Sequence, residues 1–292
     1  MPERLKNCPL CQGTQHEIFE ITTFRGQEII NQICTHCGFV FQSPRMTAEE
    51  LDDFYAREYR QFYQGDEGPT SKDLDIQTRR AASLLHFTKG NLSKVERHLD
   101  IGCSAGVLLK IFQNNYGCQA VGVEPGDSYR GYAQAQGYDV YADISELDLG
   151  AGGRFDLVSM AHVLEHITDP LAYLIALQEN YLTKSGVLLL EVPNLYAHDS
   201  FETAHMSAFS KFTLVEILKQ AGFSVIASKQ HGEPRSKLLP LYLTVLAQAG
   251  DRTAHLKVST ENFVRQKRKL GVFSRRVIQR LLPNMAWVPI EN

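Results

Sequence analysis

The sequence predicts an α/β protein whose main domain is a parallel sheet covered by helices, with a small metal-binding module before it and a helical extension after it. Residues 98–109 read as a buried strand, a glycine turn and the start of a helix. Residues 120–125, about twenty positions further on, form a second apolar run that ends in an acid. Two C-x-x-C pairs stand near the N-terminus. The first two features are typical of a strand–helix–strand unit, and the third indicates a bound metal ion.

The turn of the first unit has the sequence Gly-Cys-Ser-Ala-Gly at residues 102–106. Glycines allow the backbone to approach a ligand closely. The spacing is neither GxGxxG nor GxxxxGK[ST], and the missing lysine disfavours a nucleoside triphosphate. Glu124 ends the second strand, at the position where such folds hold the two ribose hydroxyls. We therefore expect a ligand that contains a nucleoside.

The composition is that of a globular protein with one large domain and one small one. Of the 292 residues, 43% are hydrophobic, which is enough for a sizeable core. The formal net charge is −3, so binding to nucleic acid would need a local basic patch. The first residues do not resemble a signal peptide, and no apolar run approaches the length of a membrane span. These features predict a cytoplasmic location.

The N-terminal module, residues 1–45, has the pattern of a zinc ribbon. Its two knuckles contain Cys8, Cys11, Cys34 and Cys37. This spacing indicates a four-thiolate Zn²⁺ site, with short strands at 17–23 and 28–33 forming the hairpin between the knuckles. The module is too small for a core of its own, so the metal would supply much of its folding free energy. A redox pair and unligated thiols are the alternatives, while His16 and His36 are expected to be surface residues.

Residues 46–90 are predicted to be a helical linker. Thr47 and Glu50 form a capping box that opens a first helix, and a second helix is expected over 73–88. The segment 55–68 between them is crowded with aromatic side chains. It either packs on the main domain or closes as a lid over the active site.

The main domain, residues 91–248, alternates strands and helices. Helices are expected at 107–116, 127–136, 170–181 and 212–221, and further strands at 138–141, 155–160, 187–194, 223–228 and 238–247. Strand ends at one edge of a parallel sheet face the ligand crevice. The acids and histidines that follow these strands are therefore candidate site residues.

Three stretches resemble class I S-adenosylmethionine-dependent methyltransferases. Residues 100–106, Asp-Ile-Gly-Cys-Ser-Ala-Gly, resemble motif I of that family, and residues 121–125, Val-Gly-Val-Glu-Pro, resemble motif II. Residues 163–170, Val-Leu-Glu-His-Ile-Thr-Asp-Pro, resemble the signature that follows strand four in many small-molecule methyltransferases. The resemblance implies an α/β fold: a Rossmann-like seven-stranded methyltransferase sheet with a reversed last strand, beside the small N-terminal zinc-ribbon module and the C-terminal helical extension.

The resemblance also implies the cofactor, S-adenosylmethionine, and the residues that bind it. The cofactor-binding candidates are Asp100, Gly102, Cys103, Ser104, Gly106, Glu124, Pro125, Asp143 and His162. In this family an acid after the third strand commonly holds the adenine amino group, which points to Asp143, although a solvated turn aspartate is an alternative. His162 stands where the family places a residue against the methionine part.

The loop at residues 194–210 carries the catalytic candidates, because loops at this place hold acceptor-side groups in the family. His205, followed by Phe209 and Ser210, resembles the H-x-x-x-F-S pattern of zinc-bearing sugar methyltransferases and is the expected general base. A histidine that caps the next helix or packs the loop is the alternative. The further catalytic candidates are His166, expected to begin a helix after strand four, and His198.

The named group that the chain resembles most is the deoxysugar C-methyltransferases, which combine paired cysteines with this domain. Two departures put C-methylation in doubt: Ala204 replaces the acid before the loop histidine, and the large C-terminal domain of that group is missing. A zinc-ribbon methyltransferase of polysaccharide or secondary-metabolite pathways, with a sugar-like acceptor, fits better.

Residues 249–292 are predicted to form a basic amphipathic helix and tail. Leu270, Phe273, Val277 and Leu281 recur at helical spacing among eight lysines and arginines over residues 257–280. The expected arrangement is a helix that docks this apolar stripe on the domain or on a second subunit, with its charges in water. Binding to an anionic membrane surface or to RNA is the alternative.

Three functions are compatible with these features. The leading one is an S-adenosylmethionine-dependent methyltransferase acting on a sugar or related small molecule. A zinc-ribbon RNA methyltransferase is less favoured, because the chain is acidic overall and lacks an Asn-Pro-Pro-Tyr-type motif after strand four. A catalytically silent binding or scaffold protein is disfavoured because the motif I and motif II residues are intact.

Overall fold

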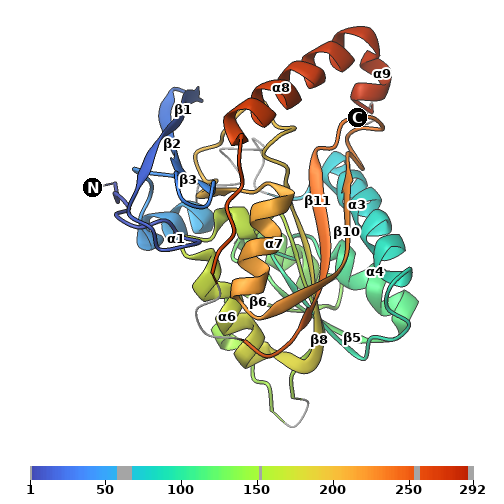
Figure 1. Cartoon of the computed structure of the whole chain (residues 1–292). Helices are drawn as coiled ribbons and strands as arrows, with labels where there is room; N and C mark the ends of the chain where they lie inside the picture. The colour runs from blue at the N-terminus through green and yellow to red at the C-terminus, as the bar shows by residue number, and fades with distance from the viewer. Residues whose placement is uncertain (1, 58–67, 151–152, 253–256, 289–292) are drawn as a thin grey trace.

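The computed structural model describes residues 2–57, 68–150, 153–252 and 257–288 (Figure 1). Most of the segment predicted as a lid, with its aromatic residues Tyr59, Phe62 and Tyr63, lies outside these residues. The lid and the division of the chain into four parts therefore stay predictions.

The main sheet has seven strands in the order β10-β11-β8-β7-β4-β5-β6. Its strands are β4 (Arg97–Ile101), β5 (Gln119–Val123), β6 (Asp139–Tyr141), β7 (Phe155–Ala161), β8 (Leu182–Pro193), β10 (Phe223–His231) and β11 (Tyr242–Ala249). β11 runs antiparallel between β8 and β10, whereas the pairs from β8 to β6 are parallel. The predicted Rossmann-like sheet with a reversed last strand is confirmed.

Helices cover both faces of this sheet. Figure 1 shows α3 (Ser71–Lys89) and α4 (Val107–Tyr116) on one side, and α6 (Pro170–Tyr181) and α7 (Lys211–Gln220) on the other. α5 (Asp127–Ala135) connects β5 with β6, and α1 (Ala48–Arg57) follows the N-terminal module. The capping box of α1 is confirmed, because the Thr47 amide donates to Glu50 and the Glu50 amide donates to Thr47.

Two local predictions were wrong. Glu165 and His166 do not begin a helix but lie in a single 3-10 turn, η2 (Leu164–His166), and α6 starts at Pro170. The residue before a proline is driven out of the helical region, and the Asp169 carboxylate caps α6 by accepting from the Ala172 amide. The last strand begins at Tyr242 rather than at residue 238, since Pro240 has no N–H for a sheet ladder.

The N-terminal module is a four-stranded sheet that includes a strand from the main domain. The predicted hairpin is present as β1 (His16–Phe24) and β2 (Gln27–Cys34), and it continues through β3 (Val40–Gln42) to β9 (Ser207–Ala208). Phe39 and Phe41, both fully buried, pack with Phe209 in one core that also holds residues of the main sheet. The module thus shares its core with the loop at residues 194–210.

The extension forms α8 (Val264–Leu281) and α9 (Pro283–Ala286). The prediction offered two places for the apolar stripe of α8. Docking on the domain was wrong, whereas docking on a second subunit stays a prediction. Leu270, Phe273, Val277 and Leu281 are exposed, while the side facing the protein carries Val264, Arg268 and Arg275. The arginines are buried because backbone carbonyls of the loop at 194–210 accept their hydrogen bonds. Within the described residues, no helix has the length and apolar character needed to cross a membrane.

Candidate active site

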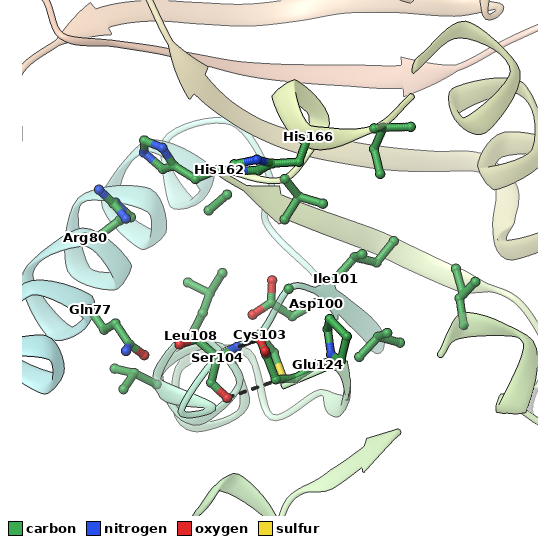
Figure 2. A pocket seen from close by; sticks show the side chains of 18 of the residues that line it. Gln77, Arg80, Asp100, Ile101, Cys103, Ser104, Leu108, Glu124, His162 and His166 are labelled. Carbon is green, nitrogen blue, oxygen red and sulfur yellow. Dashed lines mark hydrogen bonds between the residues drawn. The ribbon is translucent and has the colours of Figure 1, made fainter. Parts of the chain in front are cut away.

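A cavity of about 750 Å³ opens at the carboxyl ends of the parallel strands. Residues from α3, the β4 turn and the ends of β5, β6 and β7 line it. Figure 2 shows Ser104 and Glu124 on one side, His162 and His166 on the other, and Gln77 and Arg80 projecting from α3. A volume of this size suits a cofactor together with a small acceptor.

The glycine turn is built as the sequence predicts. Gly102 has a φ of 73°, and a Cβ there would press on the Val163 side chain at 2.5 Å, so only glycine fits. The Ser104 amide donates to one Glu124 carboxylate oxygen at 2.9 Å, and the Gly126 amide donates to the other at 3.0 Å. These bonds fix the orientation of a buried carboxylate on the cavity wall.

Asp100 is the second-last residue of β4, before this turn, and lines the cavity. Its carboxylate accepts a hydrogen bond from the Ser159 hydroxyl at 2.6 Å, and the His98 ring contacts the same hydroxyl at 2.7 Å. Because the hydroxyl proton goes to Asp100, His98 Nε2 is the donor in the second bond. Burial raises the pKa of Asp100 to about 7, with Glu124 adding to the rise and Ser159 opposing it.

The remaining cofactor candidates divide into two groups. Cys103, Pro125 and Asp143 line the cavity, and the Asp143 carboxylate also accepts from the Ser145 amide at 2.8 Å. Gly106 does not appear among the lining residues. It is the N-cap of α4, where it packs against Tyr138 and Ala133.

His162 lies on the cavity wall between two buried carboxylates. Its Nδ1 is 3.3 Å from Glu165 and its Nε2 is 3.5 Å from Glu191. Burial and the Arg80 guanidinium oppose protonation, but the two carboxylates outweigh them and raise the pKa of His162. The backbone of His162 also has a φ of 59°, which is uncommon outside glycine and is typical of functional sites.

The same cluster contains groups that the sequence did not single out. The Arg80 guanidinium is 3.1 Å from Glu191, whose other oxygen accepts from the Thr244 hydroxyl at 2.8 Å. The Tyr242 ring packs edge-on against His162 and under the Arg80 guanidinium. Arg80 and His162 thus both lie beside the Glu191 carboxylate. In the sequence, the functional importance of Glu191 was indicated only by its position as an acid inside the apolar run of β8.

The structure brings His166 and His205 together but places His198 apart from them. The rings of His166 and His205 are 4.8 Å apart at 72°, and only His166 lines the cavity. His166 Nδ1 donates to the Ala204 carbonyl at 2.9 Å, which leaves Nε2 as the atom able to accept a proton. His198 Nε2 instead donates to the Leu241 carbonyl at 3.0 Å.

Burial keeps these three histidines neutral. It lowers the pKa of His166, and it lowers the pKa of His205 to about 3 and that of His198 to about 4. Burial alone would raise the pKa of Glu165, but the hydrogen bond from His162 is the largest of the opposing effects that lower it to about 2. A carboxylate therefore lies beside Nε2 of the His166 imidazole, at 3.9 Å.

Residues 74–228, more than half of the chain, match a family model described as a methyltransferase domain. The chain belongs to this family. The resemblance to class I S-adenosylmethionine-dependent methyltransferases is thereby confirmed at the level of family and fold.

Similar proteins include ubiquinone biosynthesis O-methyltransferases. The one from Cereibacter sphaeroides is 38% identical over 100 residues, which are 32% of this chain and 39% of the relative. The one from Dinoroseobacter shibae is 33% identical over 129 residues, which are 41% of this chain and 51% of the relative. The methyltransferase domain thus matches about half or less of the length of these relatives.

A solved structure supports the fold. The 1,6-didemethyltoxoflavin-N1-methyltransferase of Burkholderia thailandensis, determined with S-adenosylhomocysteine, superposes with a TM-score of 0.55 at 21% identity. The match covers 80% of this chain and all of that one. At this identity the comparison establishes the architecture of the methyltransferase domain and nothing finer.

Outside the methyltransferase domain, the four N-terminal cysteines converge. The sulfurs of Cys8 and Cys37 are 3.6 Å apart, those of Cys11 and Cys34 are 3.5 Å apart, and all four lie within 4.8 Å of one another. No pair is joined in a disulfide. Tetrahedral thiolates about 2.3 Å from Zn²⁺ would be about 3.8 Å apart, so the donor set fits a zinc ion. His36 is exposed and His16 packs on Phe41, and neither belongs to the cluster.

Proposed function

We propose that this protein transfers the methyl group of S-adenosylmethionine to an oxygen atom of a small-molecule acceptor, a sugar or related metabolite. The proposal is supported by a single cavity that has the ordered carboxylate of Glu124 at one end and the neutral imidazole of His166, beside the Glu165 carboxylate, at the other. The names of the ubiquinone biosynthesis relatives specify O-methylation, which supports oxygen as the acceptor atom.

The ordered acids suit the nucleoside part of the cofactor. Glu124 is buried and backbone amides order its two oxygens, and a carboxylate at this strand end would accept from the ribose hydroxyls. Asp143, at the end of the next strand, would accept from the adenine amino group. The turn residues Gly102, Cys103 and Ser104, together with Asp100 and Pro125, would form the surface beneath the ribose, and Gly106 would set the start of α4.

The side of the cavity that carries Arg80 and His162 suits the methionine part. The Arg80 guanidinium is positive, the neighbouring carboxylates raise the pKa of His162, and the methionine part ends in a carboxylate. When bound, the cofactor supplies an electrophilic methyl group on a sulfonium ion, so the protein needs to align the acceptor and take up its proton.

For proton removal we propose His166, with His205 packed against it. The bond from Nδ1 to the Ala204 carbonyl fixes the tautomer and aims Nε2 away from the backbone. Glu165, 3.9 Å from that Nε2, would stabilise the imidazolium after it accepts the acceptor proton. His205 and His198 would position the loop at 194–210 on the acceptor side.

The four cysteines would hold a structural Zn²⁺ ion. Closed four-thiolate sites leave no position for a substrate, so this ion would organise the N-terminal sheet rather than take part in methyl transfer. Because β9 pairs with β3, the ion would also support the acceptor-side loop.

Calorimetric titration of S-adenosylhomocysteine tests the cofactor part of the proposal. Wild type is expected to bind in the micromolar range, and Glu124→Gln to bind roughly tenfold or more weakly, because an amide accepts fewer bonds. Glu96→Gln, an exposed glutamate near the start of β4, is the matched control and should bind like wild type. Equal affinity in all three proteins would disprove the role of Glu124, and no binding to folded wild type would disprove the enzyme itself.

Turnover with candidate acceptors tests the second part. Sugars, nucleotide sugars and phenols should be screened with labelled cofactor, with RNA as the competing acceptor class. His166→Gln should lower kcat by about 100-fold or more while cofactor affinity stays unchanged. An unchanged kcat in that variant would remove His166 from catalysis.

A further inference from the structure

α8 is an amphipathic helix that faces outward with its apolar side. Leu270, Phe273, Val277 and Leu281 follow one another at spacings of three and four residues and are 66%, 65%, 38% and 71% exposed. The apolar surface continues past the helix through the exposed Leu282, Met285 and Trp287. No described residue covers this surface, which we call the α8 stripe.

Hydrogen bonds on the opposite side of α8 prevent the helix from rotating about its axis to bury the stripe. Arg268, nearly buried, donates to the Leu195 carbonyl at 2.5 Å and to the His198 carbonyl at 2.7 Å. Arg275 donates to the Ala197 carbonyl at 2.7 Å and lies 3.0 Å from Asp199. Turning the stripe inward would break all of these bonds. The exposure of the stripe is therefore set by specific contacts.

A third observation is the charge beside the stripe. Lys269, Arg276 and Arg280 are exposed and lie along one flank, whereas Lys267 on the other flank pairs with Glu261 at 3.0 Å. No acidic residue occurs between Val264 and Leu281. The outward side of α8 thus offers hydrocarbon in the centre and positive charge along one edge.

We propose that α8 docks on an anionic membrane surface, with the stripe in the boundary between headgroups and acyl chains. An anionic bilayer is complementary to both parts of this surface, since it accepts apolar side chains and attracts lysines and arginines. A second copy of the chain would bring another helix that has cations and no acid. An RNA would meet the cations but would leave the leucines without an apolar partner.

The docking would have a consequence for the acceptor side. Arg268 and Arg275 tie α8 to residues 195–199, so the loop at 194–210 would lie within about one helix diameter, roughly 10 Å, of the headgroups. Figure 1 shows the helix crossing the molecule from the N-terminal hairpin to the ends of β10 and β11, with its outer side uncovered. Membrane docking of α8 depends on this surface alone and is compatible with any methyl acceptor.

Co-sedimentation of the full-length protein with vesicles tests the proposal. Vesicles of phosphatidylcholine with phosphatidylglycerol should carry wild type down, and vesicles of phosphatidylcholine alone should bind it roughly 100-fold more weakly. The double variant Leu270→Ser/Phe273→Ser should lose about 100-fold in partitioning to anionic vesicles, because each replaced side chain contributes roughly tenfold. Lys269→Gln/Arg276→Gln/Arg280→Gln should lose a similar amount.

The control replaces an exposed apolar side chain elsewhere. Ile226→Ser on β10, where the isoleucine is 45% exposed, should sediment like wild type. Unchanged circular dichroism and thermal midpoints would show that the variants are folded. Failure of wild type to sediment overturns the proposal, and so does equal sedimentation of the stripe variant. A wild-type dimer that does not sediment, and that Leu270→Ser/Phe273→Ser converts to a monomer, would assign the stripe to self-association instead.

Discussion

Gly271 is the point at which α8 touches the loop at 194–210 most closely, and replacing it with alanine should undock the helix. A Cβ at Gly271 would overlap the carbonyl oxygen of Tyr196, well inside the roughly 3.3 Å at which carbon and oxygen touch. The helix would have to move by about 1 Å. The 2.5–2.7 Å bonds from Arg268 and Arg275 to the loop carbonyls would then exceed hydrogen-bond length.

The expected cost can be worked out from these contacts. Losing the three charge-assisted bonds costs about 4.5 kcal/mol, and the better helix propensity of alanine returns about 1 kcal/mol. Gly271→Ala should therefore lower the free energy of unfolding by about 3.5 kcal/mol. Gly131→Ala, in the middle of α5 with no atom within 4 Å of the new Cβ, should raise it by about 1 kcal/mol.

Urea unfolding of both variants gives the comparison. Each variant changes the unfolded chain in the same way, so the difference of about 4.5 kcal/mol reports the contact with Tyr196. Hydrogen exchange should also rise at residues 194–199 in Gly271→Ala and not in Gly131→Ala. If both variants are equally stabilised, α8 is not held against the loop and the reasoning is refuted.

Two further predictions concern pH and metal. Burial lowers the pKa of His98 to about 3, whereas the unfolded chain binds this proton near pH 6.5, so stability is lost as pH falls below 6.5. Between about pH 6 and about pH 4, the free energy of unfolding of wild type should fall about 1.4 kcal/mol per pH unit more steeply than that of His98→Gln. Parallel curves for the two proteins would contradict this prediction. Anaerobically purified wild type should contain a full equivalent of zinc, as should the control variant Cys118→Ser, whereas Cys37→Ser should contain much less. Chelation should lower the unfolding midpoint of wild type. A metal-to-protein ratio near zero in wild type would rule out the site.

The glycine-turn side of the cavity was predictable because its signals are local. Gly102 and Glu124 directly follow strands whose apolar runs, turns and spacing are visible within 25 residues of one another. The seven strands with a reversed last strand followed from the family resemblance, and the capping box of Thr47 with Glu50 followed from its own four residues. Short-range chemistry fixes these elements, so the sequence states them directly.

The wall of the cavity opposite the glycine turn was harder to predict because distant residues build it. Arg80, Glu191 and Tyr242 meet in one cluster although they come from α3, β8 and β11. The spacing of Leu270 to Leu281 correctly indicated an amphipathic helix but not which side is buried. That choice depends on Arg268 and Arg275 finding carbonyl partners about 70 residues earlier in the chain, a contact that no periodicity can reveal.

The docking of α8 also affects the order in which the parts of the chain can fold during synthesis on the ribosome. The strands that frame the cofactor cavity are synthesised by residue 193, and the loop that follows them receives Arg268 and Arg275 only after 70 or more further residues. At roughly 5–20 residues per second, that interval lasts several seconds. The nascent protein would therefore complete its cofactor side well before its acceptor side has a stable shape.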